Sequence, residues 1–162
     1  MKSPTRGNVT MEEIADIIVE FYNRNKDYET PFNIIIGTDS QNFSDTKVVV
    51  VIAVQSEGHG GIYFYDIQRV NRISNVKVKL NYETSQSLAY ADRLLDILLE
   101  DKYTEVMKKA HIIIHVDAGE SIHGKTKELI PSIVGWVKAC GYDCKTKPES
   151  FVASTIADRI SK

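Results

Sequence analysis

FNIIIGTDSQNFSDTKVVVVIAVQSEGHGGIYFYDIQRV, residues 32–70, is the stretch that decides the fold class of this chain. It contains three runs rich in β-branched and aromatic residues, at 32–40, 46–55 and 61–70, and such runs are typical of strands. The link SEGHGG between the second and third runs is rich in glycine and favours a hairpin. Three strands in succession predict an antiparallel meander, with the first run as a buried central strand.

Helical and further strand patterns surround this meander. A capping box at Thr10 and Glu13 opens a helix over 10–27, in which apolar residues recur at helical spacing. After the meander follow a helix at 82–101, a strand at 111–119, a helix at 125–141, an edge strand at 142–147 and a final helix at 150–162. One helix followed by βββαβαβα predicts an α/β fold. We expect a mixed sheet with helices on both faces and an extra N-terminal helix.

Length and composition fit one globular domain. With 162 residues and 43% hydrophobic content, we expect a single domain over 1–162 whose core lies in 31–162. The longest apolar run, KVVVVIAV at 47–54, is too short to span a bilayer, and the N-terminus has no apolar targeting segment. A soluble, cytoplasmic protein is therefore expected. Cys140 and Cys144 have no second pair, which excludes a four-cysteine zinc site and predicts reduced thiols.

Charge is distributed unevenly along the chain. Residues 1–66 contain 5 Lys and Arg against 10 Asp and Glu, whereas residues 67–162 contain 15 against 12. The second part is therefore the better candidate to face a polyanion. Its clearest basic segment, at 68–79, holds four cations and no acid: Arg69, Arg72, Lys77 and Lys79. Either these cations contact phosphates or they form an ordinary solvated surface.

Four acids occupy distinct places in this order of elements. Asp39 ends the first strand of the sheet, Glu83 lies in the first turn of the long helix, Asp117 ends the next strand, and Asp158 lies in the final helix. This arrangement resembles the ribonuclease H-like superfamily of metal-dependent nucleases. Four segments are similar to the bacterial YkuK-type family of RNase H-like proteins, with a likeness that spans 10–162: GTDSQ (37–41), HVDAGESIHGKTKELI (115–130), GWVKACGY (135–142) and KPESFVASTIADRISK (147–162).

The resemblance implies a nuclease site with two divalent cations, Mg²⁺ or Mn²⁺, and a nucleic acid substrate. It implies that Asp39 bridges both ions, that Glu83 and Asp117 ligate one, and that Asp158 ligates the other. Carboxylates suit this task because hard cations prefer oxygen ligands. Three of the acids also have a simpler explanation: Asp39 bonds its own backbone, Glu83 favours a helix start, and Asp158 pairs with Lys162.

Polar residues near these acids are candidates for substrate contact. The residues assigned to substrate binding are Ser40, Gln41, Arg69, Arg72, Lys125 and Lys147. The chain lacks the histidine that well-studied RNase H enzymes carry before the last helix, so His123, Lys147 or bulk water would assist proton transfer. Whether the substrate is RNA, DNA, a hybrid or a branched molecule stays open. The alternative function is a non-catalytic nucleic-acid-binding or scaffolding module on the same fold.

Several rings and imidazoles have two explanations each. His115 shares a strand face with Asp117 and either supports that acid or packs in the core. Tyr63 and Tyr65, near the basic segment, either stack unpaired bases or pack against the sheet. Trp136 is expected in the core.

GESIHGKT at 119–126 matches the phosphate-binding pattern GxxxxGK[ST]. Only 36 residues follow Thr126, and none of them forms the apolar strand ending in Asp that such NTPases use to orient Mg²⁺. Asp117, directly before the loop, would also place negative charge beside the phosphates. An NTPase is therefore disfavoured, and Lys125 is assigned to a substrate phosphate instead.

Overall fold

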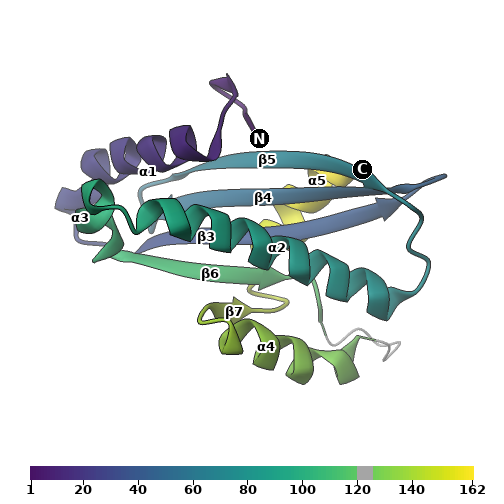
Figure 1. Ribbon diagram of the computed structural model, residues 1–162. Helices are drawn as coiled ribbons and strands as arrows, with labels where there is room; N and C mark the ends of the chain where they lie inside the picture. The colour runs from purple at the N-terminus through teal and green to yellow at the C-terminus, as the bar shows by residue number, and fades with distance from the viewer. Residues whose placement is uncertain (120–125) are drawn as a thin grey trace.

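The computed structural model describes residues 1–119 and 126–162 (Figure 1). Its strands are β1 (Lys2–Ser3), β2 (Gly7–Asn8), β3 (Phe32–Asn42), β4 (Thr46–Ser56), β5 (Gly61–Val70), β6 (Ala110–Val116) and β7 (Asp143–Lys145). Its α-helices are α1 (Met11–Asn25), α2 (Val76–Leu98), α3 (Thr104–Met107), α4 (Ile130–Ala139) and α5 (Asp158–Ser161). Short 3₁₀ helices are η1 (Lys26–Tyr28), η2 (Asp101–Tyr103) and η3 (Lys127–Leu129), and a π-helix, η4 (Val152–Ala157), leads into α5.

The described strands form one mixed sheet in the order β2-β1-β5-β4-β3-β6-β7. β3, β4 and β5 make the predicted antiparallel meander, while β6 pairs in parallel with β3 and β7 in parallel with β6. The expected mixed α/β sheet is confirmed. β1 and β2 extend the sheet beside β5 and lie outside the sequence-based expectation, because strands of two residues are too short to produce a periodic pattern.

Helices cover both faces of the sheet, as predicted (Figure 1). α1 and α2 pack on one face, where Ile34 and Ile36 are fully buried. η4 and α5 pack on the other face, against Ile35, Val49 and Val51. Because side chains alternate along a strand, the consecutive isoleucines of β3 contribute to both cores. β3 is therefore covered on both sides, and polar residues at its end can reach either layer.

Of the two long helices, α1 begins where the sequence predicts and α2 begins earlier. α1 starts at the predicted capping box, where Glu13 N–H donates to the Thr10 hydroxyl at 3.1 Å. α2 starts at Val76, before the expected position 82, because Val78 N–H donates to the Asn75 side chain at 3.1 Å. Glu83 consequently lies well inside α2 rather than in its first turn. An acid at that position is too far from the helix N-terminus to be stabilised by the helix dipole. The explanation of Glu83 as an acid that favours a helix start is therefore wrong.

Trp136 of α4 does not lie in the core, contrary to the expectation from the sequence. Val137 is fully buried, whereas Trp136 is 38% exposed. Residues adjacent in a helix point about 100° apart, so Val137 and Trp136 cannot both occupy the same apolar stripe. Cys140 is exposed and Cys144 half-buried, and both are free thiols. Of the helices in the described part of the chain, none has the length and apolar character needed to cross a membrane.

Candidate functional site

Asp39 and Asp117 are brought together by the pairing of β3 with β6. Thr38 of β3 lies opposite Val116 of β6 in this parallel register. The residues that follow them are Asp39 and Asp117. Asp39 lies within β3 rather than at its end, and Asp117 directly follows β6. The carboxyl ends of parallel strands meet at one edge of a sheet. The two acids, far apart in the sequence, therefore become neighbours.

Asp39 is buried and points toward the C-terminal helix. The Ser161 hydroxyl donates to Asp39 Oδ2 at 2.7 Å, and the same hydroxyl lies 3.0 Å from the Asp158 carbonyl oxygen. Burial raises the pKa of Asp39 above its usual value, the Ser161 hydrogen bond partly offsets this, and the charges of Asp117 and Asp158 reinforce it. Ser161 thus ties α5 to β3 at the position of the acid.

Glu83 approaches the same region from α2, on the other side of the sheet. Its carboxyl is buried, and the Ser40 hydroxyl donates to Oε1 at 2.6 Å. Burial is the main cause that raises the pKa of Glu83 to about 8, and the charges of Asp39 and Asp117 add to it. The Ser40 hydrogen bond and the charge of Lys79 act in the opposite direction. In this arrangement Glu83 carries a proton at neutral pH.

Asp117 faces a cation from the segment that follows β7. The Lys147 ammonium lies 2.8 Å from Asp117 Oδ1, and Lys147 N–H donates to the Ala118 carbonyl at 2.9 Å. The ammonium contact lies outside hydrogen-bond geometry, so the buried Oδ1 accepts no hydrogen bond from the described residues. A Cβ added to Gly119 would lie 2.9 Å from Lys147 Cβ. The two segments are therefore packed closely enough that glycine is needed there.

Asp158 occupies the first residue of α5 and pairs with Lys162 at 2.6 Å. This pair is the simpler explanation that the sequence offered for Asp158, and the structure contains it. The ion pair does not remove Asp158 from the cluster, because its charge also raises the pKa of Asp39. Asp158 therefore has one positively charged neighbour, Lys162, and one acidic neighbour, Asp39.

The four acids form one electrostatic cluster without forming a preassembled metal cage. Within residues 1–119 and 126–162, no group of three or more His, Cys, Asp or Glu side chains lies as around a metal ion. Each carboxylate instead meets a hydroxyl or ammonium group of the chain. The donor set still fits a hard divalent cation, because all four groups carry carboxyl oxygens.

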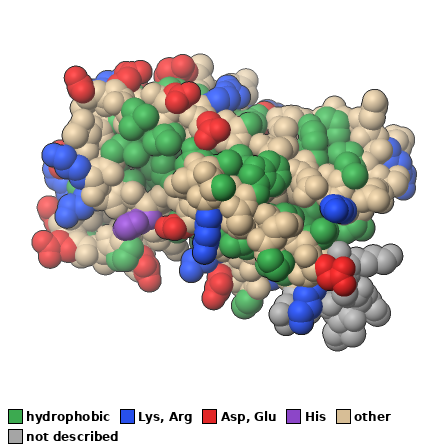
Figure 2. All heavy atoms as spheres, turned by 60° about the horizontal axis from the view of Figure 1, so that its bottom comes forward, with side chains coloured by type: hydrophobic (Ala, Val, Ile, Leu, Met, Phe, Trp, Pro, Cys, Tyr) green, Lys and Arg blue, Asp and Glu red, His purple; other side chains and the backbone are tan. Residues whose placement is uncertain are grey.

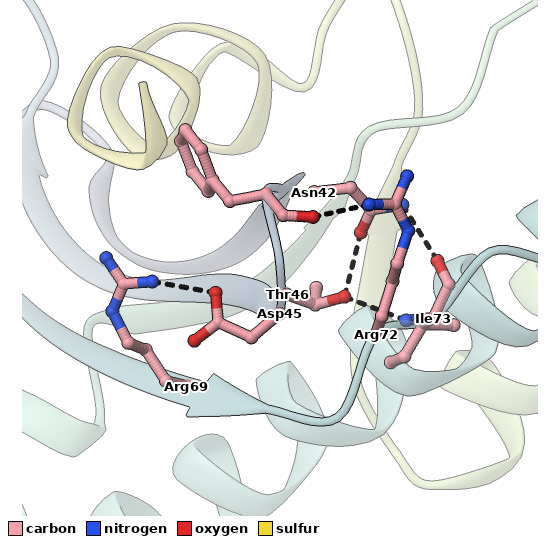
Figure 3. Close-up of polar contacts among 7 residues, drawn as sticks. Asn42, Asp45, Thr46, Arg69, Arg72 and Ile73 are labelled. Carbon is pink, nitrogen blue, oxygen red and sulfur yellow. Dashed lines mark hydrogen bonds and ion pairs between the residues drawn. The ribbon is translucent and has the colours of Figure 1, made fainter.

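The two arginines assigned to substrate are held by the turn between β3 and β4 (Figure 3). Arg69 pairs with Asp45 at 2.7 Å, and the Arg72 guanidinium donates to the Phe43 carbonyl. Sequence patterns do not reveal such partners, because the two contacts join residues that are 24 and 29 positions apart. The arginines therefore brace this turn, and only part of their surface is available to a ligand.

The other assigned residues differ in their surroundings. Ser40 is buried and committed to Glu83, whereas Gln41 is exposed at the end of β3. Lys125 and His123 lie outside the described residues. In the GESIHGKT stretch only the ends are described, and there the Thr126 hydroxyl donates to the Gly119 carbonyl at 3.1 Å.

His115 has the role of a packed core residue. It is buried, the Val152 backbone N–H donates to its Nδ1 at 3.2 Å, and its ring lies edge-on to Phe151. Burial, helped by the charge of Lys145, lowers the pKa of His115 to about 4. The imidazole is therefore neutral near pH 7, and it anchors the start of η4 to β6.

Sequence reasoning missed Lys47, which donates to the Ile160 carbonyl at 2.6 Å, and Ser161. It named Lys79 only as part of the basic segment, whereas the charge of Lys79 acts on Glu83. Only Ser161 had a usable signal, since it follows Asp158 by three positions and so shares its helical face. The described Lys and Arg side chains on the face in Figure 2 lie in separate places among acidic and hydrophobic ones.

A known protein family matches most of this chain. Residues 13–162 match the family described as Ribonuclease H-like. The chain belongs to this family. Uncharacterized protein YkuK of Bacillus subtilis (strain 168) is 28% identical over 166 residues, covering 98% of this chain and 94% of that protein. The YkuK-type RNase H-like resemblance of the sequence is therefore confirmed.

Two solved structures show weak likeness to this RNase H-like chain. The catalytic domain of Mos1 mariner transposase has a TM-score of 0.36 at 8% identity, covering 93% of this chain and 67% of that one. The Mos1 transposase catalytic domain with raltegravir and Mg has a TM-score of 0.30 at 9% identity, covering 83% and 58%. Scores this low carry no argument about function.

Proposed function

We propose that this RNase H-like protein is a nuclease that depends on Mg²⁺ or Mn²⁺ and hydrolyses phosphodiester bonds. The observation that supports the proposal is the grouping of Asp39, Glu83, Asp117 and Asp158: the charges of Asp117 and Asp158 raise the pKa of Asp39, and those of Asp39 and Asp117 raise the pKa of Glu83. Burying mutually repelling carboxylates costs stability, and such costs are commonly retained at functional sites.

In this proposal the four carboxylates hold two divalent cations. The chemistry that such cations supply is activation of the attacking water and stabilisation of the leaving oxygen. Glu83 must lose its proton before its carboxylate can ligate a cation, so cleavage should rise with pH through the range set by its pKa of about 8. Bound cations would lower that pKa and move the range downward.

Lys147 and Lys162 have a second task in this proposal. Each ammonium lies against a carboxylate of the cluster, at 2.8 Å from Asp117 and 2.6 Å from Asp158. Cations held by those acids would neutralise them, and each ammonium would then be available to a phosphate of the substrate. Their side chains are 47% and 67% exposed, which leaves room for this movement.

The direct test is a cleavage assay on labelled single-stranded, duplex, hybrid and branched substrates, with Mn²⁺ or with chelator. We expect cleavage by the wild type only with the cation, and its loss in Asp117→Asn. Asp143→Asn, an exposed acid on β7, is the matched control and should cleave normally. Cleavage that survives in Asp117→Asn, or that proceeds in chelator, would contradict the proposed site.

A non-catalytic nucleic-acid-binding module is the second candidate. It is favoured by the absence, within the described residues, of three ligands in metal-binding arrangement and by the two lysines already paired with acids. This candidate predicts nucleic acid binding that is independent of Mn²⁺ and of Asp117, with no cleavage of any substrate. The same assay, run beside a binding measurement, separates the two.

A further inference from the structure

One face of β5 is only partly covered. Side chains alternate along the strand, and Phe64 points into the core with α1 and α2, where it is 1% exposed. Tyr63, Tyr65 and Ile67 therefore point to the opposite face. The two tyrosines are half-buried, with ring centroids 6.5 Å apart, and Ile67 is 41% exposed. This face carries two neighbouring aromatic rings followed by an accessible aliphatic side chain.

The C-terminal segment covers the neighbouring strands on this side more fully than it covers β5. η4 and α5 pack over β3 and β4, and Tyr63, Tyr65, Ile156 and Ile160 each pack against the buried cluster on this side of the sheet. Beyond these contacts the described residues leave the tyrosine rings and Ile67 accessible. We call Tyr63, Tyr65 and Ile67 the β5 platform.

Lysines flank the platform on both sides. Residues that pair directly across antiparallel strands project to the same face, and Lys2 of β1 pairs with Tyr65. By the same rule, Lys47 of β4 lies beside Arg69, which follows Ile67 on this face of β5. Arg69 is neutralised by Asp45, so the two lysines supply the net positive charge.

The turn between β3 and β4 adds a third ring near the platform. Phe43 is 43% exposed, and the Arg69 guanidinium lies 6.0 Å from its ring centroid (Figure 3). Exposed rings next to cations are the features that proteins use to hold unpaired bases and the phosphates between them.

The platform is aligned with the acid cluster. Asp39 pairs with Val49, and Val49 pairs with Ile67, so the three residues form one row across the sheet. Adjacent strands lie about 4.8 Å apart, which places the Ile67 backbone roughly 10 Å from that of Asp39. Val49, between the two, is buried under η4 and α5, so a chain on the platform would pass around this segment to reach the acids.

We propose that the β5 platform binds a single-stranded nucleic acid, whose bases stack on Tyr63 and Tyr65 while its phosphates face Lys2 and Lys47. The inference deepens the proposed nuclease function, on which it rests for the role of the bound strand as substrate. A single strand is favoured because its bases are free to stack on aromatic rings, whereas a duplex keeps its bases paired inside. RNA and DNA share this chemistry.

The test is fluorescence anisotropy with labelled oligo(dT), oligo(U) and a blunt DNA duplex, carried out in chelator so that no cleavage occurs. We expect both single strands to bind more tightly than the duplex. Tyr65→Leu should weaken single-strand binding about tenfold, because one stacked base is lost, while Tyr65→Phe keeps the ring and the affinity. Lys2→Gln should lower the salt dependence by about 0.7 in log-log slope.

Ile67→Glu provides a variant that does not depend on the packing of a tyrosine. It places a negative charge on the exposed part of the platform and should weaken binding at least as much as Tyr65→Leu. Leu99→Glu adds the same charge at the 67%-exposed end of α2 and should bind like the wild type. Unchanged affinity in both Tyr65→Leu and Ile67→Glu would overturn the platform, as would tighter binding of the duplex.

The outcome separates the platform from the nuclease function. Loss of binding in the platform variants, together with no cleavage by the wild type under any condition, would retain the platform and reject the nuclease. Cleavage by the wild type, with normal single-strand affinity in the platform variants, would reject the platform and retain the nuclease.

Discussion

Replacing Glu83 with glutamine should remove a large part of the pH dependence of stability. The carboxyl has a pKa of about 8 in the folded protein against an ordinary 4.5. Between these values the unfolded chain has released the proton while the folded chain still holds it, so stability falls as pH rises. At pH 7 the difference spans 2.5 pH units, which corresponds to a cost of about 3 kcal/mol at 1.36 kcal/mol per unit. Glutamine cannot ionise, and its oxygen can still accept from Ser40.

The assay is urea unfolding in chelator at pH 5, 6, 7 and 8. We expect the wild type to lose on the order of 3 to 4 kcal/mol more than Glu83→Gln between pH 5 and 8. The comparison of slopes cancels any constant effect of the amide. Glu149→Gln, which changes an exposed loop acid, should follow the wild type. Parallel curves for the wild type and Glu83→Gln would refute the assignment of a buried, protonated Glu83.

Two further predictions concern the groups that hold the other acids. Ser161→Ala removes the donor to buried Asp39 and should destabilise the protein by about 1 to 3 kcal/mol in chelator, as measured by urea unfolding, with exposed Ser44→Ala near zero. If the two variants lose equal stability, the Ser161 contact has no energetic role. Lys147→Gln frees Asp117 and should strengthen Mn²⁺ binding in calorimetry several-fold while weakening nucleic acid binding. Weaker Mn²⁺ binding in that variant would contradict the competition between ammonium and cation.

Most of the sheet was predictable because its signals are local. The isoleucine and valine runs of β3, β4 and β6 are long enough to identify strands, and their order restricts the topology to a few choices. The start of α2 was not predictable in this way. NVKVKL at 75–80 alternates valine with lysine like an exposed strand, and only the Asn75 cap and packing of the later turns make it helical.

The candidate site was also predictable only in part. Asp39, Asp117 and Asp158 could be chosen from the order of elements together with the resemblance to the RNase H-like superfamily. The partners of two of those acids come from distant segments, Ser161 for Asp39 and Lys147 for Asp117, and no sequence pattern pairs them. The effect of burial on the pKa of a carboxyl likewise depends on layers that fold over it and not on its neighbours in sequence.

The pairing of β3 with β6 makes the position of Asp117 depend on strand alignment. Ile34, Ile35 and Ile36 lie opposite Ile112, Ile113 and Ile114, so three identical side chains face three identical side chains. Hydrophobic matching alone would tolerate a shift by one residue, which would also turn each side chain to the other face. His115 removes this ambiguity, because a shifted imidazole would lose its contact with the Val152 N–H. A residue outside the acid cluster thus selects the alignment that sets Asp117 beside Asp39.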